Sequence, residues 1–347
     1  MRTLSAFFDN PPAIPSSVAW YLDSIAESRG KQELFTRQSP QKLRALKEHA
    51  LIESAVSSNR IEGVTIDASR IATVVFGRPL LRDRNEEEVG GYREALKLIH
   101  EQGKRLGVTE ASILKLHTLA RGEIWDAGKY KEKDGDIIEK RLDGTSRVRF
   151  KTVSAKQTPT HMKNLVELWR DSTRELRTPH MILLAAFNLD FLCVHPFRDG
   201  NGRVSRLLML LQAYQGNLEV GRYISLERLI EENWERYYET LEQSSQHWHE
   251  GKHDPWPYIQ FVLYMFKLAY KDFEERLGRM ETPRGEKRSQ IEEFIAKSGE
   301  SFSVREIQDR CPGVSIDMIR RVLKDLQKEN RVECLGRGQA ARWRGIR

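Results

Sequence analysis

A polar, glycine-rich segment between two strongly apolar helical patterns is the feature that most constrains how this chain can fold. The segment runs from His195 to Arg206 with the sequence HPFRDGNGRVSR. Residues 179–194 before it and residues 204–214 at its end place apolar residues three and four positions apart, which is typical of buried helices. The pattern predicts a helical core with a polar loop at its centre.

The composition indicates a globular protein with more than one folding unit. Hydrophobic residues make up 39% of the chain and charged residues 31%, which is too apolar for a disordered chain and too polar for a membrane protein. The 347 residues exceed a typical domain of about 100–150 residues. The most apolar stretch, residues 181–194, contains Asn188 and Asp190 and is too short to span a bilayer, so no membrane partner is expected.

Two further features favour a cytoplasmic location. The first residues lack the charged start, apolar centre and cleavage site of a secretory signal. The three cysteines, Cys193, Cys311 and Cys334, lie far apart and have no spacing that suits zinc or a redox pair.

Helical periodicity extends over most of the chain. It also marks residues 41–58, 86–101, 110–120, 160–176, 231–246 and 257–277. Residues 128–159 are different, because Asp-Gly pairs at 134–135 and 143–144 flank short β-favouring stretches and predict a β-hairpin. We therefore expect a mainly α protein with one hairpin.

The C-terminal part predicts a small domain of its own. Turn-forming residues indicate a boundary near residue 280. After it come helices at 289–297 and 304–309, a turn at 311–313, a helix at 316–328 and two strands around 336–338. This is the order of a winged helix-turn-helix domain. We expect an N-terminal helical region at 1–109, a core with the hairpin at 110–280, and the winged-helix domain at 281–347.

This C-terminal part is also basic. Residues 284–347 hold 15 Lys and Arg against 10 Asp and Glu, and the third helix carries Arg320, Arg321, Lys324 and Lys328. Such a helix favours DNA as a partner. The alternative is an accessory domain whose basic residues are only solvated.

The central loop has the residue types that phosphate chemistry needs. Gly200, Asn201 and Gly202 can turn backbone N–H groups inward at the start of a helix, which makes an anion cradle. Arg203 and Arg206 lie three positions apart on that helix and can bind further phosphate oxygens.

Two more loop residues complete this chemistry. Asp199 offers a hard oxygen ligand for Mg²⁺, and His195 is the proton acceptor of the loop. The alternative is an ordinary turn after a histidine that caps a helix.

Taken together, the twelve residues resemble the signature of the Fic family, His-x-Phe-x-(Asp/Glu)-Gly-Asn-Gly-Arg-x-x-Arg, at every fixed position. The resemblance covers roughly residues 41–270. It implies a Fic-fold helical core whose hairpin is a flap over the loop. It also implies transfer of AMP from ATP to a Ser, Thr or Tyr hydroxyl of a target protein or of the chain itself.

The resemblance assigns roles within the loop. His195 would be the general base, Asp199 the Mg²⁺ ligand and Phe197 the buried anchor. The phosphates of ATP would be bound by Gly200, Asn201 and Gly202 (α and β), Arg203 (β) and Arg206 (γ). The small residue at position 202 favours AMP transfer over phosphorylation.

Other segments resemble the family as well. Tyr237 and Tyr238 resemble the residues that line the adenine pocket, with aromatic packing between helices as the alternative, although Ser245 replaces an asparagine of some relatives. The flap at 128–159 would bind an extended segment of the target protein by strand addition, with a plain surface hairpin as the alternative.

A further motif predicts a built-in brake. Ser58, Glu62 and Gly63 resemble the family's inhibitory motif (Ser/Thr)-x-x-x-Glu-(Gly/Asn), at the end of an inhibitory helix over about 41–63. A Glu62 carboxylate paired bidentately with Arg206 would occupy the guanidinium that binds the γ-phosphate. The alternative is a surface glutamate before a capping glycine.

The sequence thus leaves two functions open. One is an autoinhibited protein adenylyltransferase that uses ATP and Mg²⁺. The other is a transcriptional regulator whose core senses nucleotide while its C-terminal domain binds DNA. A homodimer is a further partner that the sequence allows.

Overall fold

The structure is a computed structural model that describes residues 2–36, 40–77, 81–122, 124–140, 145–279, 286–298, 301–311, 314–336 and 341–346. The chain forms two compact units. One consists of Met1–Arg29 with Ala45–Glu274, and the other of Gly30–Arg44 with Glu275–Arg347. The first unit contains the polar loop.

The predicted mainly α class is confirmed. The helices up to the end of the first unit are α1 (Thr3–Asp9), α2 (Ser16–Thr36), α3 (Pro40–Ile61), α4 (Ile71–Phe76), α5 (Arg84–Gln102), α6 (Glu110–Arg121), α7 (Thr158–Glu175), α8 (His180–Val194), α9 (Asn201–Gln215), α10 (Leu226–Glu232), α11 (Trp234–Ser245) and α12 (Trp256–Arg279). Short 3-10 helices η1 (Ala68–Arg70), η2 (Val220–Arg222) and η3 (Trp248–Glu250) lie between them.

The structure differs from the predicted helices in four places. The pattern at 231–246 belongs to two helices, α10 and α11, separated at Asn233. The apolar spacing does not predict α1, α2 or α4. In α2 the reason is visible, because Val18 is buried while Trp20 is 75% exposed, so its apolar residues do not form one stripe.

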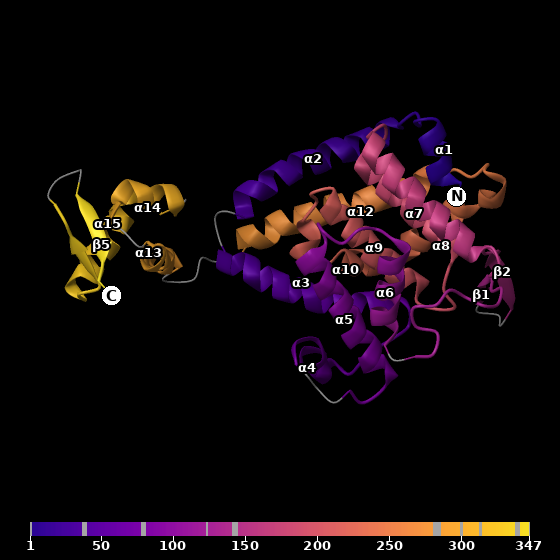
Figure 1. Ribbon diagram of the computed structural model, residues 1–347, viewed down its shortest axis with the longest axis horizontal. Helices are drawn as coiled ribbons and strands as arrows, with labels where there is room; N and C mark the ends of the chain where they lie inside the picture. Colours follow the sequence, from indigo (N-terminus) through magenta and orange to yellow (C-terminus); the bar gives the residue numbers. More distant parts are fainter. Residues whose placement is uncertain are drawn as a thin grey trace. The chain divides into compact units, whose positions relative to one another are not determined.

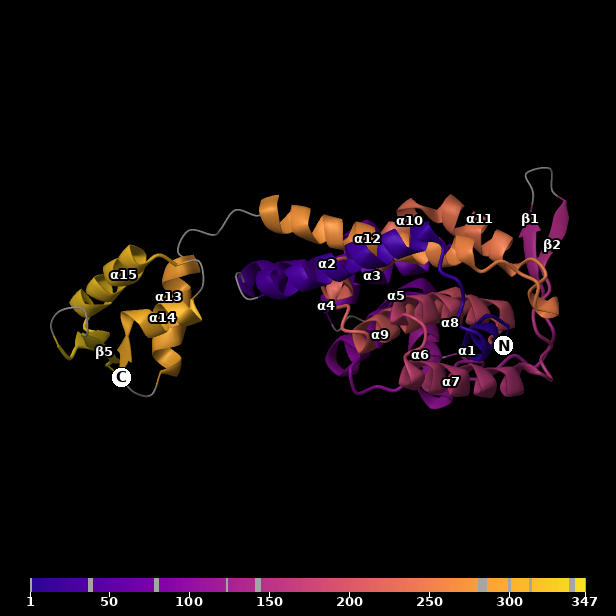
Figure 2. The same cartoon turned by 90° about the horizontal axis from the view of Figure 1, so that it is seen from above.

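Helix α8 is the centre of the first unit. Every residue from Met181 to Val194 is buried, against α1, α7, α9 and α11, as a helix that is apolar all round requires. Its two polar residues have partners: Asn188 donates to the Ser205 carbonyl at 2.7 Å, and Asp190 accepts from the Trp248 indole at 2.6 Å. Figures 1 and 2 show α8 and α9 inside this unit.

The predicted hairpin is confirmed. Strands β1 (Ile137–Lys140) and β2 (Ser146–Phe150) pair antiparallel, with Ile138 opposite Val148 and an irregularity between Ile137 and Ile138. The turn expected at 143–144 lies outside the described residues. Both views place the hairpin at the end of the first unit where the N-terminus lies (Figures 1 and 2).

The C-terminal part has its own apolar core. Its elements are α13 (Glu286–Lys297), β3 (Phe302–Ser303), α14 (Val304–Arg310), α15 (Ile316–Lys328), β4 (Val332–Cys334) and β5 (Arg342–Gly345), and the antiparallel sheet has the order β3-β5-β4. Ile291, Ile319 and Leu323 are buried at its centre. The order of elements is the predicted one, with β3 added.

Several predictions for this region fall on residues outside the described ranges. These are the boundary near 280, most of the turn at 311–313 and the tip at 336–338. The three domain ranges stay predictions. Across the described residues, no helix is long and apolar enough to cross a membrane.

Candidate active site

The loop between α8 and α9 is fixed by its own side chains. Asn201 donates to the Phe197 carbonyl at 2.8 Å, and its side-chain oxygen accepts from the Phe197 N–H at 2.9 Å. Two residues of the loop have a positive φ, His195 at 52° and Gly200 at 83°. Helix α9 starts at Asn201, so Asn201 and Gly202 belong to its first turn and not to the loop alone. The Asn201 side chain therefore closes the loop.

Phe197 is buried and stacks on His117 of α6, with ring centroids 3.7 Å apart. His117 Nδ1 accepts from the Gly128 N–H at 2.9 Å, so its Nε2 carries the proton and donates to the Asp199 carbonyl at 3.0 Å. Burial lowers the pKa of His117 to about 4, against the opposing effect of the Asp199 contact. The neutral imidazole of His117 thus supports the loop through its contacts with Phe197 and Asp199.

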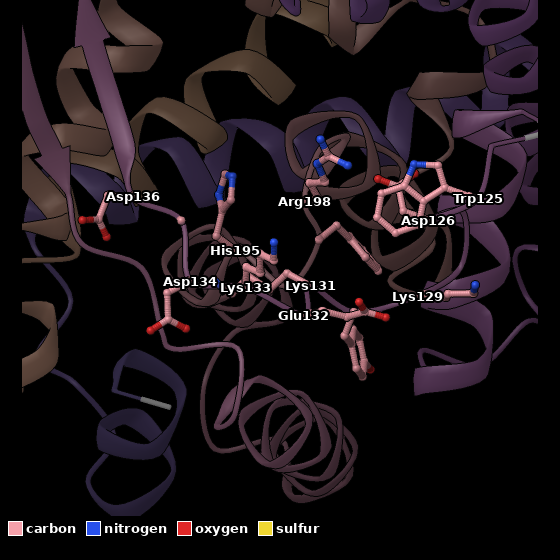
Figure 3. A pocket seen from close by; sticks show the side chains of 13 residues that line it. Trp125, Asp126, Lys129, Lys131, Glu132, Lys133, Asp134, Asp136, His195 and Arg198 are labelled. Atoms are coloured by element: carbon pink, nitrogen blue, oxygen red, sulfur yellow. The ribbon is translucent and has the colours of Figure 1, made fainter.

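His195 lies between two cavities. One has a volume of about 460 Å³ and is lined by His195, Lys131, Trp125 and Arg198 among others; we call it the Lys131 cavity (Figure 3). The other has a volume of about 180 Å³ and is lined by His195, Glu62, Gly202, Tyr237, Tyr238 and Ser245 among others; we call it the Glu62 cavity.

The electrostatics favour a neutral His195. Burial, followed by the positive charge of Lys131, lowers the pKa of His195 to about 4. Its Nδ1 is buried and has no hydrogen-bond partner among the described residues. The imidazole is therefore unprotonated at neutral pH and able to accept a proton.

The Glu62 cavity brings distant predicted residues together. Tyr237 is buried, and Tyr238 beside it contacts Arg149 of the hairpin, whose guanidinium lies 5.1 Å from the Tyr238 ring. Arg149 also donates to the Tyr238 carbonyl at 2.6 Å. The hairpin is thus attached to the wall of this cavity.

Arg206 is bound by the end of α3. Its Nη2 donates to Glu62 Oε1 and to the Ser58 carbonyl, both at 2.8 Å, and its Nε donates to Ser58 Oγ at 2.8 Å. The expected bidentate pairing of Glu62 is wrong in detail. Among the described residues Glu62 accepts one hydrogen bond from Arg206, through Nη2, while Ser58 accepts from Nε and Nη2.

The Glu62 carboxylate lies at the N-terminus of α9. A Cβ added to Gly202 would meet Glu62 Oε1 at 2.1 Å and Arg206 Nη1 at 3.2 Å. Gly63 follows with a φ of 78°, which suits the glycine that ends a helix. Arg206 Nη1 is buried without a partner among the described residues, so a donor remains for an incoming acceptor.

Arg203 points into a different environment. It is 1% exposed, and its Nη1 donates to Glu88 Oε2 of α5 at 2.6 Å and to Asn59 Oδ1 of α3 at 3.2 Å. The predicted contact of Arg203 with phosphate stays a prediction. In the structure this arginine forms a buried ion pair that connects α9 with α3 and α5.

Glu88 also holds Arg121 of α6, which donates to Glu88 Oε1 at 2.9 Å and to Asp199 Oδ2 at 2.6 Å. Burial acts to raise the pKa of Asp199, but Arg121 and Arg203 outweigh it and keep the pKa below its ordinary value. Asp199 is therefore an ionised carboxylate.

Helix α3 contacts the core through polar groups at successive turns. Besides Ser58, Asn59 and Glu62, its Ser54 hydroxyl donates to the buried Glu227 carboxylate at 2.7 Å. Tyr92 donates to the other oxygen of Glu227 at 3.0 Å. Helix α3 is thus positioned by hydrogen bonds with α9 and α10.

A metal at this site would depend on one carboxylate. Among the described residues no group of three or more His, Cys, Asp or Glu could hold a metal ion. Asp199 is 55% exposed, and each of its oxygens accepts one hydrogen bond, which leaves lone pairs toward solvent. One carboxylate fits Mg²⁺ when phosphates and water complete its shell.

Four residues of the site are absent from the sequence predictions: Glu88, His117, Arg121 and Lys131. Each is buried although its residue type is normally exposed or intermediate. His117 and Arg121 lie four positions apart on α6, so both are on one face of that helix. A polar pair on a helix face that is otherwise apolar is the sequence signal that could have found them.

The first unit is thus a helical fold whose central loop carries a neutral histidine and an ionised carboxylate. Residues 107–213 match the Fic/DOC family, which is the family that the loop motif resembles. Over 198 residues the chain is 28% identical to a protein of Nematostella vectensis named protein adenylyltransferase Fic. The match covers 54% of this chain and 43% of that protein, so the chain spans less than half of this relative.

Similar solved structures confirm the Fic-fold core. A Fic family protein from Desulfovibrio desulfuricans has a TM-score of 0.61 and 20% identity, covering 97% of this chain and 98% of that one. A Fic domain containing signaling protein from Bacteroides thetaiotaomicron has a TM-score of 0.58 and 18% identity, with 77% and 100% covered. Fic-1 from C. elegans has a TM-score of 0.57 and 19% identity, with 79% and 81% covered.

Proposed function

We propose that this chain is a protein adenylyltransferase that transfers AMP from ATP to a Ser, Thr or Tyr hydroxyl of a target protein or of itself, and that Glu62 inhibits it. The Fic/DOC domain and the name of the curated relative support the reaction class. The observation that carries the proposal is the position of His195, which lines both the Glu62 cavity and the Lys131 cavity.

In the proposed reaction the acceptor hydroxyl enters from the Lys131 cavity and ATP occupies the Glu62 cavity. His195 takes the hydroxyl proton as the oxygen forms a bond to the α-phosphorus of ATP. The bond from that phosphorus to the bridging oxygen breaks, and pyrophosphate leaves. A positioned base of this kind contributes typically ~10²–10⁴-fold to the rate.

The nucleotide would be bound by groups already present. The backbone of Gly200, Asn201 and Gly202 begins α9, where the helix dipole attracts anions. Arg206 offers its unpartnered Nη1 to the γ-phosphate. Tyr237 and Tyr238 line the same cavity and would contact the adenine.

Asp199 would hold Mg²⁺ together with phosphate oxygens and water. Bound Mg²⁺ supplies positive charge to the phosphates in the transition state. Arg121 keeps the Asp199 carboxylate ionised and directed by a hydrogen bond of 2.6 Å.

The hairpin would bind the target. Its sheet consists of two strands in the described residues, so a target segment has a strand edge on which to pair. A homodimer and a cytoplasmic location stay predictions from the sequence.

The test is incubation with α-labelled ATP and Mg²⁺, alone and with cell lysate, followed by intact-mass measurement. We compare the wild type, Glu62→Gly and the double variant Glu62→Gly/His195→Ala. The expected result is label on protein with Glu62→Gly, little with the wild type and none with the double variant. Equal labelling by the wild type and Glu62→Gly refutes inhibition by Glu62, and no label in any sample refutes the transferase.

A second function, DNA binding, is favoured by one observation in the C-terminal domain. Arg321, Lys324 and Lys328 are exposed on α15, and no ion pair is described for them, whereas Arg342 and Arg344 of β5 pair with glutamates. Exposed basic side chains that form no ion pair among the described residues, on the second helix of a helix-turn-helix, suit DNA phosphates and bases. A mobility shift with genomic DNA fragments should weaken with salt, and should be lost in Arg321→Ala/Lys324→Ala. An equal shift by that variant contradicts this function.

A further inference from the structure

Lys131 contacts the chain on both sides of His195. Its Nζ donates to the Val194 carbonyl at 3.2 Å, and its backbone N–H donates to the Pro196 carbonyl at 2.9 Å. His195 lies between these two carbonyls with a φ of 52°, a backbone conformation uncommon for any residue other than glycine. One residue therefore fixes the peptide groups on both sides of the proposed base.

Lys131 also connects His195 with the hairpin. Its side chain is buried, and Nζ donates to Thr152 Oγ1 at 2.8 Å. The Thr152 hydroxyl in turn donates to the Gly135 carbonyl at 2.6 Å. Thr152 follows β2 and Gly135 precedes β1, so both ends of the hairpin lead to Lys131. Lys131 and His195 both line the Lys131 cavity (Figure 3).

His195 and Lys131 each have charged neighbours that act on their pKa values. The positive charge of Lys131 acts on His195 from the hairpin side and lowers its pKa. The negative charges of Glu62 and Asp199 act in the opposite direction and raise the pKa of His195. Burial lowers the pKa of Lys131 to about 8, opposed by Asp134 and Asp136. Below pH 7 Lys131 is therefore protonated, in the range where a histidine normally titrates.

We propose that Lys131 is a positioning residue for His195, which holds the turn after α8 so that the imidazole faces both cavities and places an ammonium charge on the hairpin side of that imidazole. Among the described residues Nζ donates to two neutral oxygens, those of Thr152 and Val194, and to no carboxylate that would cancel its charge. This role rests on the proposed function of His195 as the base.

The first experiment measures His195 directly and does not depend on activity. The imidazole of His195 is titrated by NMR in the full chain, with its signal assigned by its loss in His195→Ala. Lys131→Met removes the charge at similar length, and Lys131→Arg keeps the charge. We expect the midpoint of His195 to rise by on the order of 1 unit in Lys131→Met and to stay near the wild-type value in Lys131→Arg.

A purely structural role predicts another result. Thr152→Val removes one acceptor of Nζ, keeps the charge, and serves as the control for destabilisation. A midpoint that is equal in Lys131→Met, Thr152→Val and the wild type overturns the proposal. If Lys131→Met does not fold, Lys131→Gln takes its place in the same titration.

The second experiment separates this role from the proposed reaction. In the Glu62→Gly background, Lys131→Met should move the acid limb of the kcat profile to higher pH and lower kcat more than it changes the KM for ATP. If the acid limb of the kcat profile lies at the same pH with and without Lys131→Met, the role of Lys131 is overturned. If Glu62→Gly itself transfers no AMP, the proposed function fails, and the NMR titration alone still decides the inference on Lys131.

Discussion

Glu62 and Arg206 are joined by a hydrogen bond of 2.8 Å across the first turn of α9. The Glu62 carboxylate lies over Gly202, where the partial positive charge of the helix N-terminus attracts anions. Under the proposed function, phosphate groups and Glu62 would therefore compete for the same place, and this competition leads to the first two predictions.

The charge of Glu62, rather than its size, should limit nucleotide binding. Glu62→Gln keeps the side-chain length and removes the charge, so it should bind MgATP about 10-fold more tightly than the wild type, equivalent to about 1.4 kcal/mol. Calorimetric titration at fixed ionic strength measures this, with Glu231→Gln, a change to a partly exposed glutamate that pairs with Arg60, as the control. Equal affinities of Glu62→Gln and the wild type would show that the charge is not what matters.

Arg206 should not be replaceable by lysine. Arg206→Lys keeps a positive charge but has no planar set of donors, so it cannot satisfy Ser58 and a phosphate together. In the Glu62→Gly background we expect the KM for ATP to rise by roughly 10-fold or more. Arg60→Lys, at a half-exposed arginine of α3, is the matched control and should leave the KM unchanged. A normal KM in Arg206→Lys contradicts the assigned role.

Glu88 should be essential for stability. Glu88→Ala removes the carboxylate that accepts from the buried guanidinium of Arg203 and one of the two that accept from Arg121, which costs about 3–5 kcal/mol of unfolding free energy. Glu94→Ala on the same helix breaks a half-exposed pair and should cost roughly 0–1 kcal/mol. Urea unfolding followed by circular dichroism compares the two, and similar losses would show that the buried network is not stabilising.

Acid should destabilise the first unit before most carboxylates titrate. The pKa values of His195 and His117 are lowered to about 4, and burial lowers that of His100 to about 3, whereas an unfolded histidine titrates near 6.5. The unfolded chain therefore binds more protons in this range. The stability from these groups is complete above pH 6.5 and is lost as the pH falls toward 4 and 3.

Thermal unfolding between pH 7.5 and 4.5 measures this loss. His117→Gln should flatten the dependence of Tm on pH, because it removes one of the three groups. His247→Gln, at a residue 66% exposed, is the control and should not change the slope. Parallel curves of Tm against pH for the wild type, His117→Gln and His247→Gln would contradict the role assigned to His117.

The contiguous part of the site could be predicted from the sequence, and its long-range partners could not. The loop from His195 to Arg206 is one segment, so its residues had to lie together wherever it folded. The spacing of Arg203 and Arg206 suggested that both face phosphate, but Glu88, 115 positions away, turns Arg203 inward. Periodicity describes one helix at a time and gives no information about which charged residue of another helix will meet it.

The fold shows the same limit. The strongly periodic helices were found with small shifts at their ends, while α2 was missed because its apolar residues are spread around the helix. Lys131 could not be singled out, because it lies in a polar, turn-rich segment where lysines are ordinarily solvated. Only the folded chain brings it beside Val194 and Thr152.

The hydrogen bonds between the end of α3 and Arg206 bear on how the proposed inhibition would end. Ser58 and Glu62 give the buried Arg206 the oxygen acceptors that a triphosphate would otherwise provide, so the resting chain carries its own counter-ion. Withdrawing Glu62 with nothing in its place would leave a desolvated cation without a neutralising partner, which is costly. Under the proposed function, release would therefore be an exchange of one anion for another, with the nucleotide as the replacement.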